Sequence, residues 1–283
     1  MTAEVRYEDT LKPQAVETPL DLLFFRPAAF ALVKVLLPTS ITPNQVTVAS
    51  IVTGLAGAVL SASERRDARV LGAFLGLAYG VLDCADGQLA RARGTSSRTG
   101  RILDGASDYV TGVATGIAIS RALSRKLGPR GAWLGVAGMA SIVAQGTLFD
   151  HAKNRYLSRV RHAFREGDDL EETLAELERT KAEGGPLVDV ALLEVYAVFL
   201  KVQAALASPS RDDAQKGPLD AAAHERFAEV ARAWAYLGPS THVALLFAAT
   251  VLDRVELYVW VRLTLGNAAA IWLRRELQKV DAR

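Results

Sequence analysis

Long apolar runs, separated by short charged turns, dominate the chain. Several of these runs approach the roughly 20 residues that a helix needs to cross a bilayer. The pattern predicts an all-α integral membrane protein with about six transmembrane helices. We expect these helices at 43–60, from 70 into an acidic stretch at 83–91, and at 100–122, 131–149, 240–252 and 255–272.

The N-terminal part, residues 1–38, has a different pattern. Across 19–37 the apolar positions are interrupted by Asp21, Arg26 and Lys34. Charges at such intervals favour an amphipathic helix lying in the membrane interface over a helix that crosses it. A further spanning helix is the alternative.

The first predicted span, which opens the transmembrane part at 39–150, has a clear start. Thr42 stands in the position of a capping side chain, and Pro43 follows at the first helical position.

Residues 151–236 change in character. A charged segment at 168–181 has helical spacing, an apolar segment follows at 187–206, and a linker at 208–218 precedes a last helix from Ala221. We expect a helical cytoplasmic insertion that packs on the membrane face or on a partner subunit. A spanning role for 187–206 is the alternative. Residues 237–283 then contain the two closing helices and a basic tail.

Composition agrees with this division. Half of the residues are hydrophobic and 23% are charged, a mixture that suits a membrane domain with soluble segments. The net charge of +2 is too small to indicate nucleic-acid binding. Basic residues beside the spans favour anionic lipid surfaces and phosphorylated substrates. The single cysteine, Cys84, excludes an internal disulfide and is interpreted as a small packing residue.

Four aspartates interrupt two strongly apolar helical segments. Asp83 and Asp86 share one helix face, and Asp104 and Asp108 share a face of the next helix, across a short hairpin. Four like charges in an apolar setting are poorly solvated unless they are protonated or bind cations. Oxygen ligands without His or Cys favour a hard ion, Mg²⁺ first, with Mn²⁺ or Ca²⁺ as alternatives.

Small and basic residues flank these acids. Gly87 and Gly100 have no side chain to hold a phosphate away from the backbone. Arg91 lies two helical turns after Asp83 and is well suited to a phosphate oxygen. Together with the aspartates, these residues predict a metal–diphosphate site.

The complete pattern, Asp-x2-Asp-Gly-x2-Ala-Arg-x8-Gly-x3-Asp-x3-Asp, resembles the motif of the CDP-alcohol phosphotransferase (CDP-alcohol phosphatidyltransferase) family of integral membrane enzymes, without a gap or substitution. The resemblance implies transfer of a substituted phosphate group from a CDP-linked alcohol, or from CDP-diacylglycerol, to an acceptor alcohol. The hydroxyl of the acceptor attacks the β-phosphorus, and CMP leaves, in phospholipid or related phosphodiester synthesis.

The resemblance also implies roles for individual residues. Two divalent ions would be held by the four aspartates, and Asp108 would serve in addition as the general base. The remaining motif positions would line the CDP pocket: Gly87, Ala90, Arg91 and Gly100. Members of the family commonly begin the first span with Pro-Asn-x-x-Thr, so Asn44 and Thr47 are expected to contact the nucleotide. Helix capping and interhelical hydrogen bonding are their alternative roles.

The acceptor is less well defined by the sequence. Arg155, Arg159 and Arg161 follow the fourth span on the motif side and suit a phosphorylated acceptor. They suit an interfacial anchor equally well. Arg262 lies within the last apolar span, where we expect it to face a cavity, to pair with an acid or to snorkel. Tyr109 occupies a position that is basic in many phospholipid-making relatives.

The resemblance implies a location in the inner or cytoplasmic membrane, with the active site facing the cytoplasm, and a homodimer. Basic residues beside the motif, after the fourth span and at the C-terminal end agree with the positive-inside tendency. The basic turn at 121–130 opposes it.

Two other classes remain open. A membrane prenyltransferase would also use aspartates and Mg²⁺, but with separate Asp-rich motifs on different helix pairs, whereas both halves here lie within 83–108. A non-enzymatic ion carrier would have intramembrane acids without the flanking glycines and Arg91.

Overall fold

The computed structural model describes residues 5–11, 14–95, 97–160, 170–206 and 221–281. Every regular element in these ranges is helical, and they contain no strand, as the apolar pattern predicts. The short 3₁₀ and π elements are η1 (Glu8–Thr10), η2 (Gln14–Val16), η3 (Asp21–Phe25) and η5 (Arg262–Gly266). The α-helices are α1 (Arg26–Leu36), α2 (Pro43–Ser61), α3 (Arg66–Arg93), α4 (Arg98–Leu127), α5 (Pro129–Val160), α6 (Leu170–Ala182), α7 (Leu187–Leu206), α8 (Ala221–Ala235), α9 (Pro239–Val251), α10 (Val255–Val261) and α11 (Asn267–Asp281).

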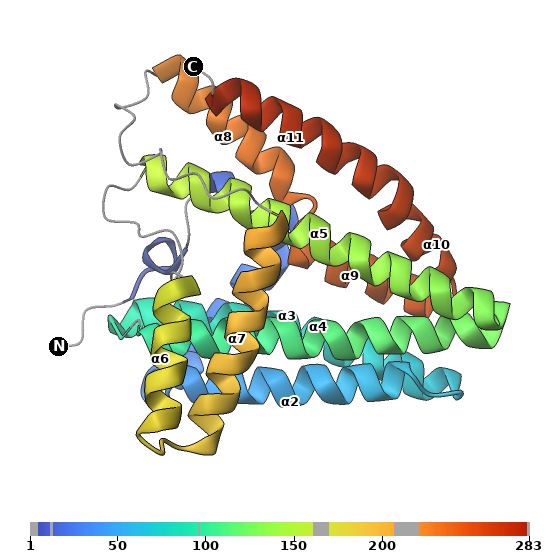
Figure 1. The fold of residues 1–283 in the computed structure, drawn as a ribbon, viewed down its shortest axis with the longest axis horizontal. Helices are drawn as coiled ribbons and strands as arrows, with labels where there is room; N and C mark the ends of the chain where they lie inside the picture. Colours follow the sequence, from blue (N-terminus) through green and yellow to red (C-terminus); the bar gives the residue numbers. More distant parts are fainter. Residues whose placement is uncertain (1–4, 12–13, 96, 161–169, 207–220, 282–283) are drawn as a thin grey trace.

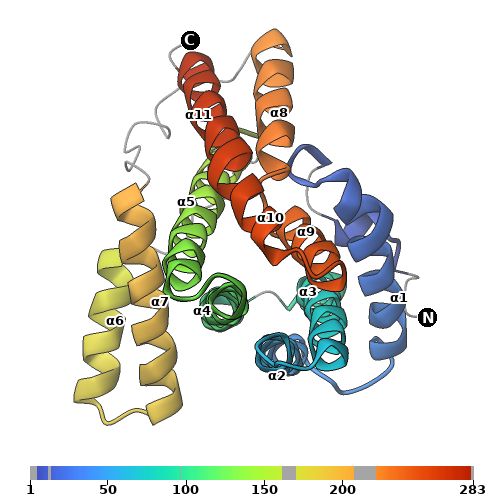
Figure 2. The same cartoon turned by 90° about the vertical axis from the view of Figure 1, so that its right-hand side faces the viewer.

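The long helices α2 to α5 form the centre of the molecule (Figure 1). Seen end-on, α2 and α3 form one pair and α4 and α5 another, and α9 and α10 lie beside both pairs (Figure 2). Short turns join each helix to the next, so neighbours in sequence run in opposite directions. The start of α2, the end of α3, the start of α4 and the end of α5 therefore meet at one end of the bundle.

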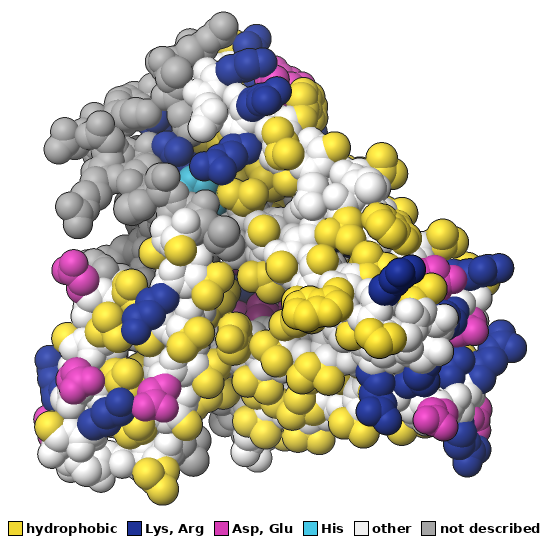
Figure 3. All heavy atoms as spheres, turned by 45° about the vertical axis from the view of Figure 1, so that its right-hand side comes forward, with side chains coloured by type: hydrophobic (Ala, Val, Ile, Leu, Met, Phe, Trp, Pro, Cys, Tyr) yellow, Lys and Arg dark blue, Asp and Glu magenta, His cyan; other side chains and the backbone are white. Residues whose placement is uncertain are grey.

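Three of the described helices are long and apolar enough to cross a membrane: α2, α3 and residues Pro129–Leu157 of α5. Six spans are therefore not confirmed. Helix α9 has only 13 residues, short for a bilayer. At most a third of each candidate window is buried by protein, and Val52, Val59 and Phe74 are largely exposed. Hydrophobic side chains cover much of the middle of the surface in Figure 3, and charged side chains lie at the right-hand end, at the lower left and at the top.

The predicted N-terminal helix at 19–37 is formed by η3 and α1. Phe25, Ala29 and Val33 are buried in a cluster that includes Ala85 and Leu89 of α3. One face of this helix thus packs on the motif helix, and its position in a membrane interface stays a prediction.

The N-terminus of α2 is held by local and distant contacts. Thr42 accepts a hydrogen bond from the backbone of Gln45, whose side chain accepts one from the backbone of Thr42, so the expected capping side chain forms a complete capping box. Arg93 donates hydrogen bonds to carbonyl oxygens in the preceding loop, including those of Ile41 at 2.6 Å and Leu36 at 2.8 Å. The start of α2 is thereby fixed against the end of α3.

A close contact between glycines brings α2 and α3 together. A Cβ atom at Gly72 would lie 2.6 Å from the carbonyl oxygen of Gly57. Small residues at such a crossing let two backbones approach within van der Waals distance.

The predicted insertion does not begin with a break at 151, because α5 continues without interruption to Val160. Its apolar segment is α7, with the predicted bounds, and α7 packs with α6 and against α4 and α5. Helix α8 packs on α5 and α11 around Phe227 and Trp234. The linker at 208–218 lies outside the described residues.

Candidate active site

The two acidic halves of the motif lie at the same end of the bundle. Helix α3 ends at Gly94, whose left-handed backbone (φ 63°) lets its N–H bond back to the carbonyl of Arg91. Helix α4 begins after Ser97, whose hydroxyl accepts a hydrogen bond from the N–H of Gly100 at 3.0 Å. These signals end one helix and start the next within a few residues, so both acidic halves are placed at the same level.

Asp86 is tied to helix α2. The hydroxyl of Thr47 donates a hydrogen bond of 2.6 Å to Oδ2 of Asp86, and both residues are buried. On the next turn of α2 towards its start, Oδ1 of Asn44 lies 3.3 Å from the position that a Cβ of Gly100 would take. The structure therefore brings Asn44 and Thr47 to the motif. Thr47 forms an interhelical hydrogen bond there, which is one of the alternative roles considered for it.

Tyr79 connects the two acidic halves. Its hydroxyl donates to Oδ1 of Asp108 at 2.8 Å and accepts from the hydroxyl of Thr111 at 3.1 Å. The charges of Asp108 and Asp83 both act on this hydroxyl. Asp83 on α3 and Asp108 on α4 are thus neighbours of one phenol group, which the motif does not include.

Helix α5 adds a charged pair to this group. Lys153 forms an ion pair with Asp150, one turn earlier on the same helix. The charges of both residues and that of Asp104 act on Asp108. Sequence analysis missed Asp150 and Lys153 as site residues, although acidic and basic residues three apart at the end of an apolar run are a recognisable signal.

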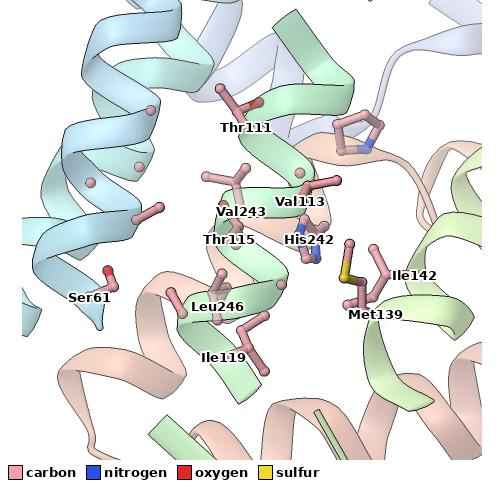
Figure 4. Close-up of a pocket in the computed structure, with 18 of the residues that line it drawn as sticks. Ser61, Thr111, Val113, Thr115, Ile119, Met139, Ile142, His242, Val243 and Leu246 are labelled. Carbon is pink, nitrogen blue, oxygen red and sulfur yellow. The ribbon is translucent and has the colours of Figure 1, made fainter. Parts of the chain in front are cut away.

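A cavity of about 640 Å³ opens beside Asp108 and extends along the bundle. Glycines line it on α2 and α3, including Gly54 and Gly76. Figure 4 shows the opposite side, where side chains of α4, α5 and α9 surround the open centre. The carboxylate of Asp108 therefore faces a space that can hold a ligand.

Residues 40–160 match the model of the CDP-alcohol phosphatidyltransferase family. This part of the chain is similar to that family. The match spans α2 to α5 and includes the whole motif, so the resemblance seen in the sequence is confirmed. A comparison with curated proteins finds no match. The match suggests transfer of a phosphate-linked group from a CDP-alcohol, and with the three apolar helices it suggests an integral membrane protein.

The resemblance implies that the four aspartates of the motif hold metal ions. Within them, no three side chains of His, Cys, Asp or Glu are gathered closely enough to hold a metal ion. The donor chemistry nevertheless suits a hard divalent ion, because all four motif side chains are carboxylates. Asp104 and Asp108 are also exposed, and Asp108 lines the cavity. Metal binding by Asp83, Asp86, Asp104 and Asp108 stays a prediction.

Arg91, the last residue of the first half of the motif, is held by contacts with the N-terminal segment and with Gly87. Its Nε donates a hydrogen bond of 2.6 Å to the carbonyl oxygen of Thr10. Its Nη1 lies 3.4 Å from the position that a Cβ of Gly87 would take. The guanidinium therefore lies over Gly87, where the methyl group of an alanine would make van der Waals contact with it, and Ala90 follows on the same helix. Phosphate binding by Arg91 stays a prediction.

Two of the three arginines expected at the acceptor, and Arg262, are among the described residues. Arg155 and Arg159 are half-buried on the last turns of α5, and Arg161 lies outside the described residues. Arg262 lines the cavity at 2% exposure and donates a hydrogen bond of 3.3 Å to the carbonyl oxygen of Leu237. Of the roles considered for Arg262, the structure favours the one that faces a cavity.

Proposed function

We propose that the protein transfers a substituted phosphate group from a CDP-linked alcohol, or from CDP-diacylglycerol, to the hydroxyl of an acceptor alcohol. The acceptor oxygen forms a bond to the β-phosphorus, the bond from that phosphorus to the CMP oxygen breaks, and CMP leaves. The hydroxyl proton passes to Asp108. This reaction is a more specific version of the transfer that the family match suggests. The protein would then act in phospholipid or related phosphodiester synthesis.

The observation that supports the proposal best is the position of Asp108. It is the last acid of the motif, it accepts a hydrogen bond from Tyr79, and it lines a cavity large enough for a substrate. A general base must lie within reach of the proton that it removes, in a place that substrate can enter. The position of the Asp108 carboxylate on the cavity wall supports this role.

The other three aspartates would hold two divalent ions together with Asp108. When bound, such ions neutralise the diphosphate and stabilise the charge that develops on the leaving CMP oxygen. Thr47 orients Asp86 through the 2.6 Å hydrogen bond. The carboxylate of Asp86 is thereby fixed before any ion arrives, which reduces the cost of organising the site.

The CDP moiety would lie on the motif end of α2, α3 and α4. Gly87 and Gly100 leave the backbone open to a phosphate, and Arg91 presents its guanidinium over Gly87. Asn44 lies beside Gly100 and would contact the nucleotide there. Thr47 contacts Asp86 directly, so its effect on the nucleotide would pass through that carboxylate.

CMP release from purified protein in lipid nanodiscs tests the proposal. We expect CMP from CDP-diacylglycerol or a CDP-alcohol in the presence of Mg²⁺ and an acceptor from a panel of alcohols and phosphorylated alcohols. Asp108→Asn should abolish turnover and retain Mg²⁺-dependent CDP binding by isothermal titration. Full turnover in Asp108→Asn would refute the assignment of the base.

The same titration separates the alternatives. Binding of prenyl diphosphate without binding of CDP would indicate a prenyltransferase. Binding of metal ions alone, without either diphosphate, would indicate an ion carrier.

A further inference from the structure

Helix α7 packs on the start of α4, although it lies outside the matched segment, 40–160. Leu193, Tyr196 and Leu200 of α7 are buried in one cluster with Ile102 of α4. The three α7 residues are spaced three and four positions apart, so they lie on one face of their helix. Figure 2 shows the hairpin of α6 and α7 beside α4 and α5, on the side away from α2 and α3.

The ring of Tyr196 lies against Gly105 of α4. A Cβ at Gly105 would be 2.8 Å from Cε2 and 3.0 Å from Cδ2 of the tyrosine. Because glycine has no side chain, the ring can contact the backbone of α4 directly. Gly105 follows Asp104 and precedes Asp108 by three positions. Tyr196 therefore contacts α4 between the two acids of this half of the motif.

Helix α4 is thus held from two sides at the level of its acids. Asp104 and Asp108 are four positions apart and share one face of α4, where Tyr79 of α3 donates a hydrogen bond to Asp108. Gly105 is rotated from Asp104 by about 100° around the helix axis. The ring of Tyr196 therefore packs on α4 without covering the face that carries the acids.

The start of α4 depends on such packing because its local sequence favours a helix only weakly. Gly100 and Gly105 both lie within the first eight residues of this helix, which begins at Arg98. Glycine destabilises a helix relative to alanine, because its backbone loses more freedom on folding. The first turn of a helix also lacks intrahelical partners for its N–H groups. Contacts from neighbouring helices must therefore fix the turn that carries Asp104.

We propose that Tyr196 is a positioning residue for the transfer reaction. Its ring stabilises the turn of α4 at Gly105 and thereby keeps Asp104 and Asp108 aligned with the acidic half of the motif on α3. This inference rests on the proposed function, because it concerns the geometry in which those acids act. A displacement of about 1 Å at reacting groups can lower a rate by about 100-fold. A helix outside the matched segment would then contribute to the rate of the reaction.

Three substitutions separate this role from a general effect on stability. Tyr196→Ala removes the ring from Gly105, and Tyr196→Phe keeps it. Leu177→Ala is the matched control, because Leu177 of α6 is buried in the same cluster while α6 packs mainly on α7. The control leaves a space in the cluster and retains the ring on Gly105.

Steady-state CMP release is measured at a temperature at which thermal unfolding shows all four proteins to be folded. Tyr196→Ala should lower kcat by about 10- to 100-fold with little change in donor KM, because misplaced acids slow the reaction while the expected nucleotide contacts on α3 remain. Tyr196→Phe and Leu177→Ala should retain a kcat close to that of the wild type. An unchanged kcat in Tyr196→Ala, or an equal fall in Leu177→Ala, would overturn the inference.

Hydrogen exchange of the backbone amides at 102–108 gives a measurement that needs no turnover. These amides should exchange faster in Tyr196→Ala than in the wild type, in Tyr196→Phe and in Leu177→Ala. Equal exchange in Tyr196→Ala and the wild type would overturn the inference. If the wild type released no CMP and exchange still depended on the ring, the proposed function would fail while the support of α4 by Tyr196 stood.

Discussion

The hydrogen bond from Thr47 to Asp86 allows a direct test of how the motif is organised. The donor and acceptor oxygens lie 2.6 Å apart, and the residues are 3% and 6% exposed. Thr47→Val removes the donor and keeps the branched shape. A hydrogen bond to a charged group contributes about 1.5–3 kcal/mol, and burial leaves little water to replace it. If Asp86 holds an ion, loss of this orienting partner should raise the Mg²⁺ concentration for half-maximal CMP release by about 10- to 100-fold, the usual effect of removing an outer-shell partner of a metal ligand.

The assay is a Mg²⁺ titration of CMP release at saturating CDP donor. Thr47→Ser keeps the hydroxyl and should titrate close to the wild type. Thermal unfolding of all three proteins shows whether the valine variant is folded at the assay temperature. A folded valine variant with an unchanged Mg²⁺ midpoint would refute the role of this hydrogen bond in preparing Asp86.

Three further substitutions test other contacts. Tyr79→Phe removes the donor to Asp108, and we expect kcat to fall about tenfold with little change in donor KM, which steady-state CMP release measures; an unchanged kcat would contradict it. Glu17→Ala removes the buried ion-pair partner of Arg26, so the free energy of unfolding should fall by about 3–5 kcal/mol. A calorimetric unfolding midpoint equal to that of the wild type would contradict this prediction. Gly105→Ala forces its new Cβ against Tyr196 and should destabilise by about 1–3 kcal/mol; truncating that tyrosine should then relieve the effect, and additive losses would count against the contact.

Local signals made part of this fold predictable. The capping box at Thr42, the bounds of α7 and the helical hairpin of the motif follow from residues within a few positions of one another. Such signals act through side-chain spacing on one helix and need no knowledge of the tertiary structure. The aspartates could be selected for the same reason, because their spacing is a property of the sequence itself.

The contacts that complete the site are different in kind. Tyr79 of α3 donates a hydrogen bond to Asp108 of α4, and Tyr196 of α7 packs on Gly105 of α4. These pairs depend on how the helices cross, and the crossing cannot be inferred from the residue spacing within each helix. Six spans are not confirmed, because composition alone does not set helix length: α9 has only 13 residues, and a π segment at 262–266 separates α10 from α11.

The cavity is lined partly by residues outside the matched segment, so different parts of the chain would carry the transfer reaction and the selection of its substrate. All four aspartates lie within 40–160, so the proposed transfer chemistry depends on that segment. The cavity walls also come from α7, α9 and the π segment, through Phe199, Val243 and Arg262. Because a pocket discriminates between substrates by its walls, residues beyond the matched segment would select the alcohol that reacts. The same motif can therefore serve different substrates when the surrounding helices change.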